Sequence, residues 1–327
     1  MGQMRQWWIV PGPDGGVAEL RTVDIPLPAA GQVLVRVIGA GLNRGELMAR
    51  AALRSQHLSA RPFPSGIEFA GLIEAVGGEV TGWPVGTRVM GRGRSCHADY
   101  TLADAGELMA TPSQLSDVEA AAIPNVFVTA HDALVTAAGT GAADRVLITA
   151  GASGVGTAAI QIARHLGARR VVATTRSPAK AAALLALGAT EVIDTSAEGW
   201  PELVLERVDG VDVVIDQVGG RLFPGLLRTM AVQGRYVSVG RNDGNAAPLD
   251  LDLLARQRLT LIGVTFRTRS PAEAQACSAR FAANLLAEFR PGGLRPTVDR
   301  TFPLDSLPAA QEYMAADTQV GKILLTP

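Results

Sequence analysis

Apolar and polar positions alternate differently in the two parts of the chain that meet near Pro124. Before Pro124, short runs rich in β-branched residues are separated by turns that contain Gly and Pro; the runs cover residues 32–38, 68–76, 87–91 and 98–103. Period-two alternation bounded by turn residues predicts strands. We therefore expect the first third of the chain to form a small β-rich, barrel-like module.

After Pro124, near-continuous apolar runs alternate with Ala-rich helical stretches. The runs cover residues 146–150, 171–175, 191–194, 211–216, 235–240 and 259–264. Buried strands separated by helices of about 10–15 residues are typical of βαβ units, in which helices cover both faces of a parallel sheet. The pattern predicts an α/β fold, with a doubly wound domain of about six strands that is large enough for two mononucleotide-binding halves.

The last 60 or so residues return to mixed structure. Ala274, Cys277, Phe281 and Leu285 recur at spacings of three and four, and the Pro-Gly-Gly at 291–293 follows them. This spacing predicts a helix over 271–289. A strand over 296–303, a helix over 306–316 and a final strand over 322–326 are expected after it.

Composition excludes several classes of protein. The 327 residues are 47% hydrophobic and 19% charged, with a net charge of -1 and no basic block, so neither wholesale disorder nor nucleic-acid binding is expected. No run of about 18 apolar residues predicts a membrane span. Cys96 and Cys277 lie far apart and form no disulfide framework. We expect a soluble, cytoplasmic protein. Only Lys180 and Lys322 are lysines, so nearly all the positive charge of the chain is carried by arginine.

A glycine-rich turn between a strand and a helix is the strongest local signal. The apolar run 146–150 is followed by a turn and helix start that contain Gly151, Ser153, Gly154, Val155 and Gly156. Glycines let backbone N–H groups approach a pyrophosphate, and the helix N-terminus adds the positive end of its dipole. The turn departs from strict G-x-G-x-x-G at Ser153, and a structural glycine turn is the alternative. Its position between strand and helix favours a dinucleotide site.

The end of the next strand indicates which dinucleotide is bound. An acidic residue at this point accepts hydrogen bonds from the ribose of NAD, but the chain has Thr175, Arg176 and Ser177 here, with Lys180 one helical turn later. A guanidinium and an ammonium can bind a 2′-phosphate. We therefore predict NADP(H); the alternative is a solvated helix start.

Further cofactor positions are expected after the later strands, because ligands of parallel sheets bind beyond the carboxyl ends of the strands. The sequence places Val218, Gly240, Arg241 and Phe266 there. Gly240 fits this role best, since only backbone can lie close against a ribose. Arg241, and Arg267 which follows Phe266, each have three possible partners: a phosphate, the substrate or water.

The motifs together resemble the zinc-independent quinone oxidoreductases of the medium-chain dehydrogenase/reductase superfamily, and within it the p53-inducible branch. The similar segments are 43–50, 66–77, 120–134, 151–164, 209–220 and 299–325. The resemblance implies a GroES-like catalytic domain from residues 1–124 and 265–327 around a Rossmann domain of residues 125–264. It also implies a homodimer that uses NADPH to reduce quinones or α,β-unsaturated carbonyls.

The resemblance assigns roles to two more residues and argues against a metal. Asn43 is expected to contact the nicotinamide or the substrate oxygen, with a strand-ending turn as the alternative. Thr129 would lie beside the nicotinamide or act as a helix N-cap. Zinc-dependent relatives carry a Cys near position 43 and a His where this chain has Ile67. We expect no metal site, since Cys96 and His97, as strand neighbours, would point to opposite faces.

Without a Lewis acid, hydride addition to an already activated acceptor is favoured over alcohol–ketone interconversion. The expected activity is NADPH-dependent quinone reduction, with enone or enoyl-thioester reduction and non-catalytic NADP binding as alternatives. Similar enzymes place a tyrosine where this chain has Arg54, which leaves the proton donor open; His57 is a candidate. The apolar run 259–264 is expected to be an edge strand through which two copies pair.

Overall fold

The structure is a computed structural model that describes residues 2–47 and 61–327. The chain divides into two compact units, Met1–Asn125 with Pro271–Pro327, and Val126–Ser270. The second boundary lies six residues after the predicted one at 264/265. The reason is that Arg269 pairs with Asp132 at 2.5 Å and so keeps the segment after the last strand with the middle unit.

The first unit is rich in β-structure. Its strands are β1 (Gln3–Val10), β2 (Val17–Asp24), β3 (Gln32–Gly41), β4 (Phe63–Pro64), β5 (Glu68–Val76), β6 (Arg88–Arg92), β7 (Tyr100–Asp104), β8 (Met109–Ala110), β15 (Val298–Pro303) and β16 (Lys322–Thr326). They form a three-stranded sheet, β2-β1-β4, and a seven-stranded sheet, β15-β16-β3-β5-β6-β8, in which β7 also pairs with β3. The predicted β-rich module is confirmed.

Alternation explains why these strands form. In β3, Val33, Val35 and Val37 are buried in a cluster with Phe69 of β5, whereas Arg36 is exposed. Neither strand of the β1–β2 hairpin is among the predicted elements. Most side chains of β2 are exposed, so this strand shows no buried face in its sequence, whereas β1 does bury Met4, Trp7 and Ile9. Among the described residues, the helices of this unit include α2 (Asp117–Ala120), α9 (Pro271–Leu285) and α10 (Leu307–Ala315).

The second unit is a parallel six-stranded sheet with the order β11-β10-β9-β12-β13-β14. The strands are β9 (Arg145–Ile148), β10 (Arg170–Thr175), β11 (Glu191–Asp194), β12 (Val211–Asp216), β13 (Met230–Ser238) and β14 (Thr260–Gly263). This order, which reverses between the first and fourth strands of the unit, is that of the doubly wound Rossmann fold. The predicted strands match, except that β13 begins five residues earlier than expected.

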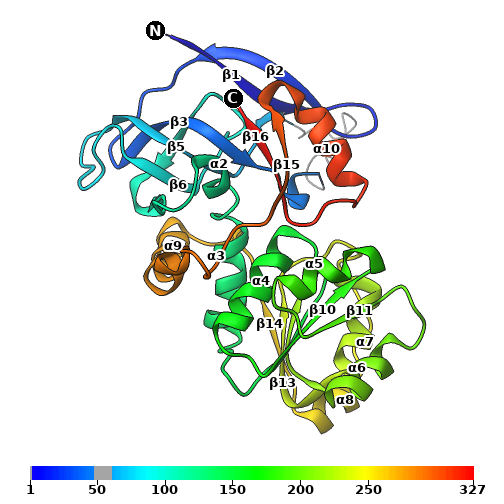
Figure 1. Ribbon diagram of the computed structural model, residues 1–327. Coiled ribbons are helices and arrows are strands. Elements are labelled where there is room, and N and C mark those ends of the chain that lie inside the picture. The colour runs from blue at the N-terminus through cyan, green and yellow to red at the C-terminus, as the bar shows by residue number, and fades with distance from the viewer. Residues whose placement is uncertain (1, 48–60) are drawn as a thin grey trace. The chain divides into compact units, whose positions relative to one another are not determined.

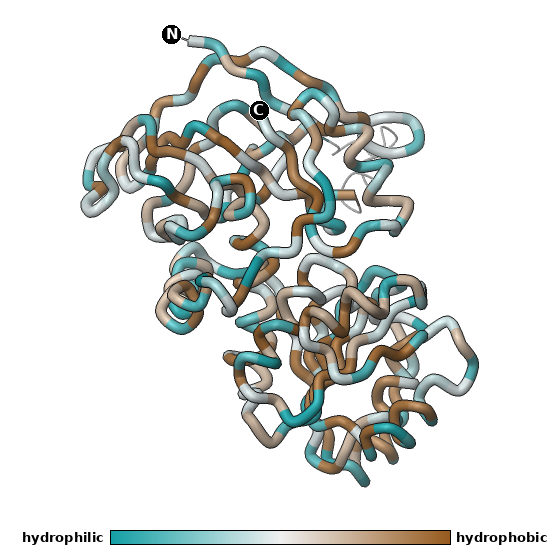
Figure 2. Tube along the Cα trace, viewed as in Figure 1, coloured by the Kyte–Doolittle hydropathy of each residue, from teal (hydrophilic) through white to brown (hydrophobic). Residues whose placement is uncertain are grey.

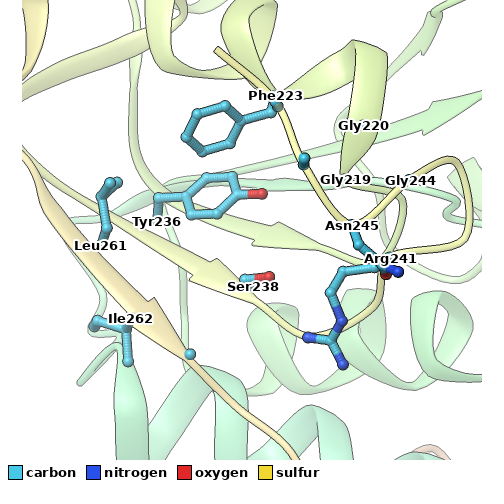
Figure 3. Close-up of a pocket in the computed structure, with 13 residues that line it drawn as sticks. Gly219, Gly220, Phe223, Tyr236, Ser238, Arg241, Gly244, Asn245, Leu261 and Ile262 are labelled. Carbon is cyan, nitrogen blue, oxygen red and sulfur yellow. The ribbon is translucent and has the colours of Figure 1, made fainter. Parts of the chain in front are cut away.

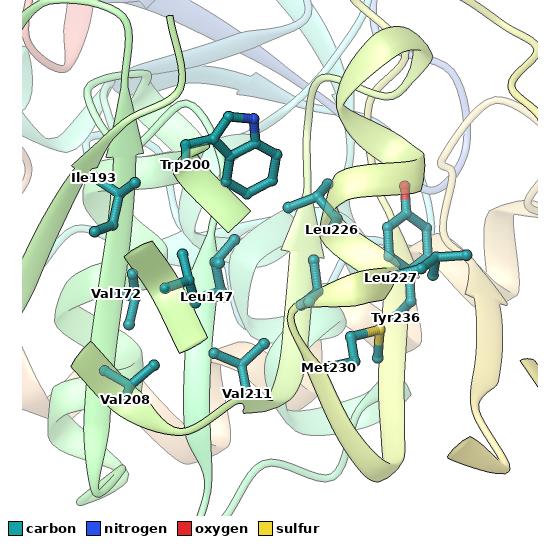
Figure 4. Packing of buried hydrophobic residues seen from close by; sticks show 12 residues of the cluster. Leu147, Val172, Ile193, Trp200, Val208, Val211, Leu226, Leu227, Met230 and Tyr236 are labelled. Atoms are coloured by element: carbon teal, nitrogen blue, oxygen red, sulfur yellow. The ribbon is translucent and has the colours of Figure 1, made fainter. Parts of the chain in front are cut away.

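Helices cover both faces of this sheet (Figure 1). They are α3 (Val126–His131), continued by the π-helix η2 (Asp132–Ala137), and α4 (Gly154–His165), α5 (Ala181–Ala186), α6 (Trp200–Val208), α7 (Phe223–Arg228) and α8 (Leu251–Gln257). On one face, Trp200 of α6 and Leu226 of α7 pack over the buried strand residues Leu147, Val172 and Val214 (Figure 4). Figure 2 colours the same trace by hydropathy, with hydrophobic residues concentrated in the interior of this unit and hydrophilic and hydrophobic residues mixed along its helices.

A helix needs about 20 predominantly apolar residues to span a bilayer. Within residues 2–47 and 61–327, no helix is long and apolar enough to cross a membrane.

Candidate functional site

The glycine-rich turn joins β9 to α4, as the sequence predicts. Ser153 is the N-cap of α4, and its Oγ accepts a hydrogen bond from Gly156 N at 3.0 Å. A Cβ on Gly156 would lie 2.4 Å from the carbonyl oxygen of Ala150 and 2.7 Å from that of Gly151. The turn therefore leaves no room for a side chain at Gly156. The first turn of α4 contains no acidic residue, so the positive end of its dipole suits an anion.

A buried carboxylate holds the next loop beside this turn. Asp216 ends β12 and is fully buried. Its oxygens accept hydrogen bonds from Thr149 Oγ1 at 2.7 Å, from the backbone N–H groups of Val218 and Gly219 at 2.9 Å each, and from the Tyr236 hydroxyl. Burial and the neighbouring Asp216 carboxylate raise the pKa of Tyr236, so its hydroxyl remains a donor. The loop that carries Val218 is thus tied to β9 and β13.

Gln217 completes this connection between loops. Its amide Nε2 donates to Thr149 O at 2.7 Å, and its Oε1 accepts from Ser153 Oγ at 2.7 Å. A Cβ on Gly240 would lie 2.4 Å from Gln217 O, so the loop after β13 packs backbone to backbone against the loop after β12. Val218 and Gly240 therefore lie near the glycine-rich turn, at the carboxyl ends of the strands. Their contact with a cofactor stays a prediction.

The predicted phosphate-binding residues follow β10. Arg176 is exposed, Ser177 and Lys180 are half-buried, and Thr175 Oγ1 accepts a hydrogen bond from Ser177 N at 3.0 Å. The guanidinium of Arg221, and with a smaller effect that of Arg176, lower the pKa of Asp243 to about 2. The positive field of Arg176 therefore extends to the loop after β13.

Phe266 and Thr129 are held by packing within the middle unit. The guanidinium of Arg269 lies 4.7 Å from the centre of the Phe266 ring, and its Nη2 pairs with the buried Asp132. Thr129 is the fourth residue of α3 and is buried. The expectation that it opens this helix as an N-cap is wrong, because α3 already begins at Val126.

Arg241 contributes to a pocket of about 310 Å³ on one face of the sheet. Figure 3 shows Tyr236, Ser238 and Arg241 around this space, with Leu261 and Ile262 of β14 at its other side. The glycines of the β9–α4 turn do not line it. The pocket is thus a separate feature from the dinucleotide turn.

A second cluster of polar residues surrounds Asn43 in the β-rich unit. Glu68 of β5 is fully buried and pairs with Lys322 of β16, Nζ to Oε1, at 2.6 Å. Asn43 Nδ2 donates to the same Oε1 at 2.8 Å, while Asn43 Oδ1 accepts from Asn125 Nδ2 at 2.8 Å and from Lys322 Nζ at 3.0 Å. Four segments far apart in the sequence thus meet at one ion pair.

Glu46 binds the backbone at the edge of this cluster. Its carboxylate accepts hydrogen bonds from Asn43 N at 2.8 Å and Gly66 N at 3.1 Å. Burial raises the pKa of Glu46 to about 7, against the lowering effect of these two N–H donors and of Lys322. His97 lies nearby, with Nδ1 2.9 Å from Ser65 Oγ, and burial lowers its pKa to about 4.

Four residues of this cluster were not predicted as site residues: Glu46, Glu68, Asn125 and Lys322. The one available signal was Lys322, a lysine at the start of an apolar strand in a chain that uses arginine for nearly all its positive charge. Cys96 and His97 lie in a loop after β6 and not in a strand, so the geometric argument based on strand neighbours is wrong. Among residues 2–47 and 61–327, no three His, Cys, Asp or Glu side chains form a metal-binding group. Arg54 and His57 lie outside the described residues.

The opposite pKa shifts of Glu46 and His97 predict a compensated pH dependence of stability. His97, shifted from 6.5 to about 4, contributes stability above pH 6.5 that is lost as the pH falls towards 4. Glu46, shifted from 4.5 to about 7, contributes stability below pH 4.5 that is lost as the pH rises towards 7. Between these limits the two slopes, each at most about 1.4 kcal/mol per pH unit, oppose each other.

Urea unfolding across this pH range can separate the two contributions. Relative to the wild type, His97→Gln should lose stability as the pH rises, and Glu46→Gln should gain it. The double variant serves as the control and should follow the wild-type profile. Parallel profiles for the two single variants would contradict the assigned shifts.

The fold and the two clusters define a two-domain oxidoreductase with a dinucleotide-binding Rossmann unit. Residues 29–141 match the alcohol dehydrogenase GroES-like domain, and residues 154–283 match the zinc-binding dehydrogenase domain. The chain is 30% identical to bovine quinone oxidoreductase-like protein 2, over 90% of this chain and 85% of that protein. The chain belongs to the quinone oxidoreductases of the medium-chain dehydrogenase/reductase superfamily, as its motifs predict.

The chain spans only a small part of some other relatives, which are much longer proteins. The chain is 37% identical to the spectinabilin polyketide synthase system protein NorB of Streptomyces orinoci, over 98% of this chain but only 14% of that protein. Among solved structures, a mycobacterial protein complexed with NADPH is 28% identical, with a TM-score of 0.87 and coverage of 99% of this chain and 100% of that one. The CurK enoyl reductase is 27% identical, with a TM-score of 0.86 and 99% of both chains covered.

Proposed function

We propose that this enzyme uses NADPH to reduce quinones by hydride transfer, without a metal. The observation that carries the proposal is the cluster around Asn43. At the positions where zinc-dependent relatives have a Cys and a His, this chain has Asn43 and Ile67, and Glu68 is already neutralised by Lys322 at 2.6 Å. These residues do not fit a catalytic zinc ion. An acceptor that needs no Lewis acid is therefore favoured.

The residues of the middle unit fit a dinucleotide. The turn at Gly151, Ser153, Gly154, Val155 and Gly156 would hold the pyrophosphate, because a Cβ at Gly156 would collide with the backbone and because α4 begins there. When bound, the reduced nicotinamide supplies a hydride to an electron-poor carbon of the acceptor.

Residues around the turn would bind the rest of the cofactor. Thr175, Arg176, Ser177 and Lys180 would bind a 2′-phosphate. The remaining positions proposed near the cofactor are Thr129, Val218, Gly240, Arg241 and Phe266. Asn43 would contact the nicotinamide or the acceptor oxygen.

A second candidate function is reduction of an enoyl thioester. The similarity to polyketide synthase proteins and to the CurK enoyl reductase favours it. Both reactions add hydride to a carbon conjugated with a carbonyl group, so the same site residues serve either one.

A homodimer and a cytoplasmic location complete the proposal. β14 is the end strand of the six-stranded sheet, and its Leu261 is 39% exposed. An unpaired strand edge with apolar side chains suits pairing with a second copy of the chain. Cys96 and Cys277 are both buried and form no disulfide, which agrees with a reducing compartment.

Oxidation of NADPH by the purified chain tests the proposed function. The acceptors are 1,4-benzoquinone, phenanthrenequinone and crotonyl-coenzyme A, each measured with NADPH and NADH and after treatment with a chelator. We expect turnover with quinones that survives chelation. Faster reduction of the thioester would favour the second candidate. Binding of NADPH without reduction of any acceptor would overturn both and leave a cofactor-binding protein.

A further inference from the structure

Lys322 has a buried ammonium group in an otherwise apolar strand. It is 3% exposed, and Ile323, Leu324 and Leu325, which follow it in β16, are buried. Its Nζ donates to three acceptors: Leu42 O, Asn43 Oδ1 at 3.0 Å and Glu68 Oε1 at 2.6 Å. An ammonium has three donors on a compact tetrahedral centre, so all of them are used. The planar guanidinium of arginine cannot reproduce this geometry.

Both oxygens of the partner carboxylate, that of Glu68, accept hydrogen bonds. Glu68 Oε1 accepts from Lys322 Nζ and from Asn43 Nδ2, and Glu68 Oε2 accepts from Asn125 N at 2.8 Å. A buried ion pair contributes little net stability, since an apolar pair of similar volume is often as stable or more so. Stability alone therefore does not explain why the chain keeps two charges here.

The ion pair sets the orientation of the Asn43 amide. The side-chain carbonyl oxygen accepts from Lys322 Nζ and Asn125 Nδ2, and the amide nitrogen donates to Glu68 Oε1. A flipped amide would place its NH2 group against the ammonium and its oxygen against the carboxylate. Opposite charges on the two sides of the amide therefore allow one orientation only.

Of the two Nδ2 protons of Asn43, one makes a weaker hydrogen bond than the other. Nδ2 donates it to Gly41 O at 3.3 Å, the longest of the four hydrogen bonds made by this side chain. A ligand oxygen can replace this acceptor while the other three bonds keep the amide in place. A fixed donor with one exchangeable partner is the arrangement required to bind an oxygen that gains negative charge.

We infer that Lys322 is a positioning residue: with Glu68 and Asn125 it holds the Asn43 amide so that one Nδ2 proton is presented to the nicotinamide carboxamide oxygen or the acceptor oxygen. The inference rests on the proposed function, in which Asn43 contacts one of these groups. It goes further because it assigns the orientation of Asn43 to a lysine that is far from it in the sequence, and because it requires both charges of the pair.

Three variants measured in the holoenzyme test this role. Lys322→Met should lower kcat by about 10²-fold, because a displaced donor loses contact with the reacting group. The KM for NADPH should stay within about threefold, since the cofactor's phosphates are bound elsewhere. Lys322→Arg should not restore kcat. The double variant Glu68→Gln with Lys322→Met removes both charges; it should recover thermal stability but not kcat.

A matched control separates positioning from folding. Arg88 pairs with Asp117 at 2.8 Å in the same unit and makes no contact with Asn43. Arg88→Met should lower the thermal midpoint without changing kcat. A wild-type kcat in the double variant would overturn the inference, as would a loss in Lys322→Met that matches only its loss of folded protein.

A second readout is independent of activity. In protein labelled with 15N-asparagine, the side-chain signals of Asn43 are assigned with Asn43→Ala, and the Nδ2 proton bonded to Glu68 should exchange slowly with water. In Lys322→Met it should exchange at least about tenfold faster. If the wild type reduces no acceptor, the proposed function fails while this measurement still tests the orientation. Equal exchange in both proteins would overturn the inference.

Discussion

Gly156→Ala is expected to weaken NADPH binding by about 10²-fold or more. The new Cβ would lie 2.4 Å from Ala150 O and 2.7 Å from Gly151 O, so the turn and the start of α4 must move apart. Losing even one or two charge-assisted hydrogen bonds from this turn to the pyrophosphate costs about 1.5–3 kcal/mol each. Titration of NADPH by its fluorescence, with circular dichroism to measure folding, would detect the loss.

Substitutions at two other glycines of the same unit serve as a comparison and a control for Gly156→Ala. A Cβ on Gly151 would approach Ala173 Cβ to 3.0 Å, so Gly151→Ala should have a smaller effect. A Cβ on Gly141 would meet nothing within 4 Å, and Gly141→Ala should bind NADPH as the wild type does. Wild-type affinity in a folded Gly156→Ala protein would show that this turn does not hold the cofactor.

Replacing both Arg176 and Lys180 with methionine is expected to remove the preference for NADPH over NADH. A charge-assisted hydrogen bond to phosphate contributes about 1.5–3 kcal/mol, so losing two should raise the Kd of NADPH by about 10²-fold or more. NADH lacks the 2′-phosphate, so its Kd should stay nearly constant. Calorimetric titration of both dinucleotides at two salt concentrations would measure the difference and its screening.

Arg170→Met is the matched control for the charge change. Arg170 is an exposed residue at the amino end of β10, the strand whose carboxyl end leads to Arg176 and Lys180. Its replacement removes a positive charge far from the carboxyl end, where ligands of parallel sheets bind, so the preference for NADPH should persist. If the wild type binds both dinucleotides equally, or if the double variant keeps its preference, the proposed 2′-phosphate site is wrong.

Local patterns predicted the fold well because they report periodicity and burial. The strands β9, β10, β11, β12 and β14 begin and end within about two residues of the predicted runs, since each is a short apolar run bounded by polar residues. The glycine-rich turn was recognisable because a strand, three glycines and a helix are contiguous in sequence. By contrast, β2 was not predicted, since its exposed side chains carry no burial signal.

The contacts of the Asn43 cluster could not be predicted from local sequence patterns. Lys322 and Glu68 are 254 positions apart, and Asn125 and Asn43 are 82 apart. A pattern could mark Lys322 as unusual but could not name its partner, because the partner depends on how β16, β3 and β5 pair in one sheet. The sequence also could not show whether Thr129 is a helix cap. The structure shows that it is not, because α3 begins at Val126.

The sequence by itself determined the alternation of strands and helices, the dinucleotide turn and the two cations after β10. These features are contiguous in the chain, so their residue types and spacing are sufficient to define them. Only the tertiary structure decided that Lys322, Glu68, Asn43 and Asn125 share one hydrogen-bonded cluster, and that burial shifts the pKa values of Glu46 and His97 in opposite directions. Desolvation and long-range pairing exist only after the sheets have packed, because they depend on which groups are brought together and removed from water.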